Sequence, residues 1–106
     1  MNTKQNRSKE TIKYLEKLTE KKLSLGNFLL SIRQGEEMTQ IEFAKMLGIS
    51  KQYLCDIEHE RRFISPKTAE SFAKMLGYSS EQFVRLCLQD MMDRDKLPLI
   101  VSVKAA

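Results

Sequence analysis

Residues 50–59 carry polar side chains whose types and spacing suit hydrogen bonding to the edges of nucleic-acid bases. The segment opens with Ser50, a helix-capping residue, and buries Leu54 and Ile57 on one side. The other side carries Lys51, Gln52, Cys55, Asp56 and His59, at spacings of one, three and four residues. The first turn of this helix is polar and not acidic, which suits a helix that reads bases in a DNA groove.

The residues needed for catalysis or metal binding are scarce in this chain. It has 106 residues, with one histidine, His59, and two cysteines, Cys55 and Cys87, far apart in the sequence. These cannot form an ordinary zinc site or a disulfide framework, and reduced thiols suit a cytosolic protein. Cys55 is either a small polar filler or a redox switch. Because no nucleophile has a neighbouring base and no carboxylates cluster, we expect no enzyme activity, no metal and no cofactor.

The polar segment is preceded by another short helix that ends in a tight corner. Thr39 and Glu42 form a capping box. Met38 and Phe43 occupy the two positions of a hydrophobic staple. This helix stops at Gly48, and the sequence Gly-Ile-Ser leads directly into the next helix. Two short helices joined in this way predict a helix-turn-helix, which binds DNA by placing its second helix in the major groove.

Three further helices complete an all-α arrangement. We expect one from Ser24 to about Gly35, one opened by Ser65-Pro66, and one over about 80–94. The motif FAKMLG occurs at 43–48 and again at 72–77, each time followed by one residue and a serine. This repeat predicts the same helix-to-helix corner used twice in one bundle. The expected domains are a leader at 1–23, a helical domain at 24–94 and a C-terminal segment at 95–106.

The net charge of the chain is concentrated at its start. Residues 1–22 hold seven Lys and Arg against three Glu, which leaves 11 basic and 11 acidic side chains in the other 84 residues. Helical spacing of apolar residues in 8–22 predicts an amphipathic leader helix, whose basic residues either contact phosphates or remain solvated. The sequence has no membrane-spanning run and no secretory signal, so we expect a cytoplasmic protein associated with the nucleoid.

The C-terminal segment carries the only strand signal in the sequence. In LPLIVSV, residues 97–103, β-branched and apolar residues alternate with Ile100 and Ser102. A lone strand leaves backbone groups unpaired, so we expect it to pair with its own copy across a two-fold axis. The preceding helix has an apolar arc wider than one small core normally covers. The residues expected at the dimer interface are Met91, Leu99, Ile100, Val101 and Val103.

A set of spaced residues within 24–88 matches a known pattern. These residues are Arg33, Thr39, Gln40, Glu42, Phe43, Ala44, Leu47, Gly48, Ile49, Ser50, Leu54, Ile57, Glu58 and Arg61. Together they resemble the Cro/CI-type helix-turn-helix of the XRE family. The resemblance implies a lambda-repressor-like domain of five helices. It also implies binding to double-stranded DNA at a two-fold operator, with half-sites about one helical turn, or roughly 34 Å, apart.

The resemblance also implies roles for single residues. Gln40 would hydrogen-bond a phosphate and brace the second helix, while Lys51 and Gln52 would reach guanine and adenine edges. Asp56 either accepts from a cytosine amino group or repels phosphate. Tyr53 either contacts the DNA or packs at the edge of the helix. The DNA-binding set implied in this way is Gln40, Ser50, Lys51, Gln52, Tyr53, Cys55, Asp56, Arg61 and Arg62.

Other matched positions concern the framework of the domain. In proteins of this type the counterparts of Arg33 and Glu58 form an ion pair that ties the first helix to the recognition helix. Arg61 and Arg62 suit backbone phosphates, with a solvated basic pair as the alternative. Two departures affect this loop. Glu60 stands where the pattern usually has glycine, and the connection RRFIS is one or two residues longer than the common form.

Two functions fit these features. The first is a homodimeric, sequence-specific repressor of its own operon. The second is an antitoxin, because the domain followed by a C-terminal strand also resembles HipB-type antitoxins, and HigA-type antitoxins share the helical core. The leader helix would then be a candidate element for binding a toxin. The two functions overlap, since antitoxins of these types commonly repress their own genes as well.

Overall fold

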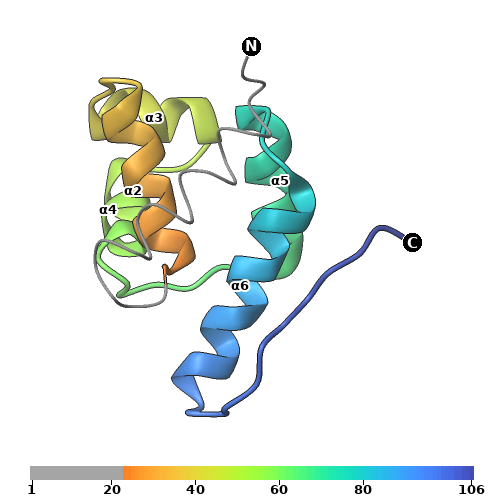
Figure 1. The fold of residues 1–106 in the computed structure, drawn as a ribbon. Helices are drawn as coiled ribbons and strands as arrows, with labels where there is room; N and C mark the ends of the chain where they lie inside the picture. The colour runs from red at the N-terminus through yellow and green to blue at the C-terminus, as the bar shows by residue number, and fades with distance from the viewer. Residues whose placement is uncertain (1–22) are drawn as a thin grey trace.

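Five helices, each opened by a serine or threonine, account for most of residues 23–106, the part of the chain that the computed structural model describes (Figure 1). They are α2 (Leu25–Gly35), α3 (Gln40–Leu47), α4 (Lys51–Glu58), α5 (Pro66–Leu76) and α6 (Ser80–Arg94). The prediction of an all-α domain of five helices is confirmed for this part of the chain. The predicted leader helix lies outside the described residues and stays a prediction.

Local capping signals determine where the helices begin and end. Each N-cap side chain accepts a hydrogen bond from a backbone N–H of the first helical turn. The N-caps are Ser24, Thr39, Ser50, Ser65 and Ser79. The capping box of α3 is complete, with Thr39 and Glu42 each accepting from the backbone N–H of the other. Both FAKMLG copies end in a left-handed glycine, at φ 73° for Gly48 and 74° for Gly77, so the repeat is one corner used twice.

The helices bury one continuous core that leaves the outer side of α4 exposed. α5 and α6 pack against each other, while α3 packs against both α4 and α5. Phe28 of α2 and Phe83 of α6 are fully buried with ring centroids 5.6 Å apart, and Tyr78 contacts both rings. Phe43 and Leu54 bury the inner faces of α3 and α4. The core side of the helix-turn-helix therefore rests on packed aromatic and aliphatic side chains.

α2 approaches the end of α4 more closely than a side chain would permit. A Cβ atom at Gly26 would overlap the backbone carbonyl oxygen of Ile57. Glycine is therefore required at this position because of close backbone packing, although its own backbone is helical. The contact fixes the C-terminal end of α4 against the first turn of α2.

The C-terminal strand predicted to pair across a dimer is not formed in the single chain, because residues 23–106 contain no strand. After α6 the chain continues as an irregular segment that turns back along this helix (Figure 1). Gln89 of α6 is only 5% exposed and binds this segment through its side chain. Its Nε2 donates to the Leu99 carbonyl oxygen at 2.9 Å, and its Oε1 accepts from the Val101 N–H at 2.8 Å. One chain supplies no second strand, so a buried amide satisfies these backbone groups instead.

Candidate nucleic-acid interface

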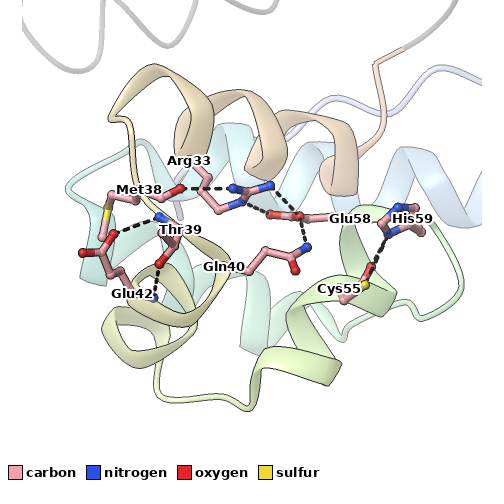
Figure 2. A network of polar contacts seen from close by, with 8 residues as sticks. All are labelled: Arg33, Met38, Thr39, Gln40, Glu42, Cys55, Glu58 and His59. Atoms are coloured by element: carbon pink, nitrogen blue, oxygen red, sulfur yellow. Dashed lines mark hydrogen bonds and ion pairs between the residues drawn. The ribbon is translucent and has the colours of Figure 1, made fainter.

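A buried carboxylate joins three helices at the helix-turn-helix (Figure 2). Glu58, at the end of α4, has a side chain that is 1% exposed. It accepts from Arg33 Nε at 2.7 Å and from Arg33 Nη2 at 3.2 Å. Gln40 of α3 donates its Nε2 to the same carboxylate at 2.9 Å. The structure thus brings together the two residues expected to pair and adds Gln40, so α2, α3 and α4 meet at one charged group.

The contact between Gln40 and Glu58 orients the first residue of α3. Gln40 is half-buried, and its amide nitrogen faces the interior carboxylate. The family resemblance implies that this residue braces the recognition helix, but it does not indicate which group of the protein receives the hydrogen bond. The phosphate contact implied for Gln40 stays a prediction.

The outer face of α4 is formed by its first turn and by a paired acid one turn later. Lys51 and Gln52 are exposed directly after the N-cap Ser50. Asp56 Oδ1 accepts from Gln52 Nε2 at 2.9 Å and from Arg61 Nη2 at 2.9 Å. The hydrogen bond from Arg61 lowers the pKa of Asp56 below its ordinary value, against the opposing effect of desolvation. Asp56 is therefore ionised at neutral pH, with its charge paired to Arg61.

The remaining predicted residues border the same face. Tyr53 is half-buried against the core, and the guanidinium carbon of Arg62 lies 4.1 Å from the centre of its ring. Cys55 is half-buried as well, with its Sγ 3.5 Å from Nδ1 of His59 (Figure 2). Arg61 approaches the same sulfur, with 3.6 Å between Nη2 and Sγ. Packing at the helix edge, one of the two alternatives for Tyr53, agrees with its burial.

The loop after α4 keeps a tight turn without the usual glycine. Glu60 adopts a left-handed backbone with φ 59° and is exposed. The backbone N–H groups of Arg61 and Arg62 both donate to the Asp56 carbonyl oxygen, at 2.8 and 3.2 Å. These bonds place both arginines beside the outer face of α4. The glutamate thus makes the turn more costly without preventing it.

Sequence reasoning missed two framework residues of α6. Asp90 Oδ2 accepts from the Leu25 N–H, in the first turn of α2, at 3.1 Å. Burial raises the pKa of Asp90 to about 6, although the bond from Leu25 opposes this shift. Gln89 binds the C-terminal segment as described above. The sequence separation of Asp90 and Leu25 is 65 residues, and neither α6 residue lies in a local motif that could have signalled its contact.

Residues 23–106 contain no group of three metal-ligating side chains and no helix long and apolar enough to cross a membrane. They do contain two short helices, a left-handed glycine corner and an exposed, braced second helix, which together define a helix-turn-helix domain. The helix-turn-helix family matches residues 29–83, about half of the chain. The chain belongs to this family and is of the XRE type that its sequence resembles.

Two curated proteins of Bacillus phage phi105 are similar to the chain. The immunity repressor protein is 34% identical over 55 residues, which cover 52% of this chain and 38% of that protein. The ImmF control region 10 kDa protein is 38% identical over 53 residues, which cover 50% of this chain and 59% of that protein. The chain thus matches less than two thirds of either relative's length. No solved structure matches the chain.

Proposed function

We propose that the chain is a DNA-binding transcriptional regulator that inserts α4 into the major groove. The observation that carries this proposal is the first turn of α4, where Lys51 and Gln52 are exposed. The buried contacts of Glu58 hold this helix against its neighbours (Figure 2). The polar side chains of its first turn therefore project from a fixed support. Family membership supports the same function, and the name of one phage relative, an immunity repressor protein, favours a repressor.

Within this proposal, two side chains read bases and their neighbours bind the DNA backbone. Lys51 donates to guanine O6 and N7, and Gln52 forms a bidentate contact with adenine N6 and N7. Gln40 at the start of α3, Tyr53 of α4 and Arg62 of the following loop bind phosphates. Phosphate contacts set the position of the helix in the groove, while the two base contacts supply the preference for sequence.

The test compares binding of the full chain to DNA upstream of its own gene with binding to a random duplex. Replacing Gln52 by alanine removes one bidentate contact and should weaken specific binding by about 1–3 kcal/mol, or roughly 5- to 150-fold. Binding to random DNA should change little. The control is Gln34→Ala, which removes an exposed glutamine of α2 and should affect neither. If the wild-type chain shows no preference for any sequence, the proposed function is wrong.

We further propose that the regulator is a homodimer joined through its C-terminal segment. The side chains of Val101 and Val103 are half-buried, whereas Ser102 is exposed and Ile100 is 83% exposed. Gln89 occupies the backbone edge of Leu99 and Val101. The backbone groups of Ile100 and Ser102 form no hydrogen bond with other residues of 23–106. An apolar segment with one edge occupied and the other edge open favours pairing with a second strand.

Two copies of this edge are complementary when they run antiparallel. Ile100 of one copy then pairs with Ser102 of the other through two hydrogen bonds, and Val101 lies on the two-fold axis. A cysteine at position 101 would face its own copy within disulfide range, whereas cysteines at position 102 would be too far apart. In a Cys55→Ser background, Val101→Cys should therefore crosslink on oxidation and Ser102→Cys should not. A monomer by sedimentation, or equal crosslinking of both variants, contradicts this arrangement.

The antitoxin alternative depends on the HipB and HigA resemblance of the sequence. Neither phage relative has a name that refers to a toxin. The name of the immunity repressor protein instead favours the repressor function.

A further inference from the structure

Asp56 contacts two other polar residues of the proposed DNA-binding face. It lies one helical turn after Gln52 and accepts from the Gln52 Nε2 at 2.9 Å. The same oxygen, Oδ1, accepts from Arg61 Nε at 3.2 Å and from Arg61 Nη2 at 2.9 Å. The Asp56 side chain is 26% exposed and that of Arg61 is 54% exposed. One carboxylate oxygen therefore links a base-reading residue of α4 to a basic residue of the following loop.

This contact restricts how Gln52 can present its amide. A glutamine side chain has several rotamers, and its carbonyl and amino groups can exchange places by rotation of the last bond. Asp56 is ionised and can only accept, so it selects the orientation in which the amino group faces it. The Gln52 carbonyl oxygen and the second N–H remain free. Those are one acceptor and one donor, the pair that an adenine requires in the major groove.

We propose that Asp56 is a positioning residue for base recognition, which fixes the amide of Gln52 for adenine and is itself neutralised by Arg61. This inference rests on the proposed function, because it assigns a role within the same DNA-binding face. It also explains how an acid is tolerated there. An unpaired carboxylate facing DNA would repel phosphates, but Arg61 supplies a compensating charge at hydrogen-bonding distance. The role differs from reading cytosine directly, which was the alternative that the sequence left open.

The test selects preferred sites from random duplexes with the full chain and compares base preferences of variants position by position. Gln52→Ala identifies the base pair that Gln52 reads. Asp56→Ala should weaken the preference at that same base pair by about 2- to 12-fold, the usual cost of ordering one flexible side chain on binding. It should also strengthen binding to random DNA, because a negative charge is removed and Arg61 is released. A variant that only destabilised α4 would weaken both kinds of binding.

Two further variants and one spectroscopic measurement sharpen the result. Asp56→Asn keeps an acceptor for Gln52 and should retain most of the preference. Glu70→Ala removes a carboxylate of equal charge from an exposed pair with Lys74 on α5 and should leave base preferences unchanged. In free protein, the side-chain amide signals of Gln52 in a ¹⁵N–¹H spectrum should shift in Asp56→Ala and not in Glu70→Ala.

The possible outcomes separate this inference from the proposed function. If the wild-type chain selects a site and Asp56→Ala preserves the preference at the Gln52 base pair, the positioning role is wrong while the regulator stands. If Asp56→Ala instead loses preference at a different base pair, Asp56 reads a base directly and the inference is overturned. If the wild-type chain selects no site, the proposed function and this inference fail together.

Discussion

Replacing Glu58 by glutamine tests whether one buried carboxylate holds α2, α3 and α4 together. The substitution keeps the shape of the side chain but removes its charge and adds an amino group. Donors from Arg33 and Gln40 converge on both carboxylate oxygens, so either orientation of the new amide places its amino group against another donor. Arg33 would also lose the only anion that the structure places beside it within residues 23–106.

The size of the effect follows from burial. Removing one partner of a buried ion pair costs about 3–5 kcal/mol, because the other charge remains without compensation. Arg33 is 15% exposed and keeps some contact with water, which places the expected loss near the lower limit, at about 3 kcal/mol. A domain of this size has a free energy of unfolding of only about 5–15 kcal/mol. The loss should therefore move the midpoint of urea unfolding down by about 2–3 M.

The assay is urea unfolding at neutral pH, followed by circular dichroism of the full chain. Glu70→Gln is the matched control, because Glu70 pairs with Lys74 at 3.8 Å on the surface and its side chain is 49% exposed. This control should change the free energy of unfolding by less than about 0.5 kcal/mol. A double-mutant cycle adds the single variants Arg33→Met and Glu58→Met and their double variant. The double variant should lose much less free energy of unfolding than the two single variants lose in sum. A loss below about 1 kcal/mol for Glu58→Gln, or strictly additive losses in the cycle, would refute the reasoning.

Three further changes test other parts of the framework. Gly26→Ala should lower the free energy of unfolding by about 1–3 kcal/mol, because its methyl group overlaps the Ile57 carbonyl oxygen; an unchanged urea midpoint would contradict the close approach. The folded-state pKa of Asp90 is raised to about 6, so the folded protein binds this proton more tightly than the unfolded chain does. The stabilisation that protonated Asp90 gives the folded state is therefore fully present below about pH 4 and is lost as pH rises through 6. The free energy of unfolding should fall by about 1 kcal/mol over this range, after allowance for the partial exposure of Asp90. Asp90→Asn should flatten that part of the pH profile of stability, and a profile unchanged from wild type would count against the assignment. Glu60→Gly should raise the thermal midpoint, with a gain of about 0.5–1 kcal/mol, since glycine adopts φ 59° without strain; a lower midpoint would contradict this.

The helix boundaries could be predicted because their signals are local. A serine or threonine at each start and a glycine after α3 and α5 act within one or two turns, and the structure has all of these elements. The strand predicted at 97–103 is not formed in the single chain, because its signal is not local in the same sense. Its alternating pattern describes what the segment can do, but strand formation depends on a second strand, which is not a property of the segment alone. Gln89 shows the local alternative that the pattern could not reveal.

The candidate site was predictable in its residues and less so in their connections. Spacing placed Lys51, Gln52 and Asp56 on one side of a helix, as the structure does. Spacing could not show that Asp56 is bound by Arg61, because the position of the arginine depends on a left-handed turn at Glu60, where the family pattern has glycine. The contact between Asp90 of α6 and the start of α2 could not be predicted either, because the two residues are 65 positions apart in the sequence. Both contacts depend on the tertiary fold and not on local spacing.

The distribution of charge makes the salt dependence of DNA binding informative about the leader. Residues 23–106 carry as many acidic as basic side chains, and the excess of four positive charges lies in residues 1–22. On and beside the outer side of α4, Lys51 and Arg62 are the basic residues that donate no hydrogen bond to an acid of residues 23–106. Since Lys51 is assigned to a base, Arg62 is left to bind a phosphate in each protomer of a dimer. About two phosphates are then neutralised, and log K should fall against log salt with a slope of about −2. Replacing Lys13, Lys17, Lys21 and Lys22 by glutamine in the full chain should leave that slope unchanged if the leader stays clear of DNA. A wild-type slope far steeper than about −2 that falls toward about −2 in the substituted chain would show that the leader supplies the phosphate contacts, while base preferences stay with α4.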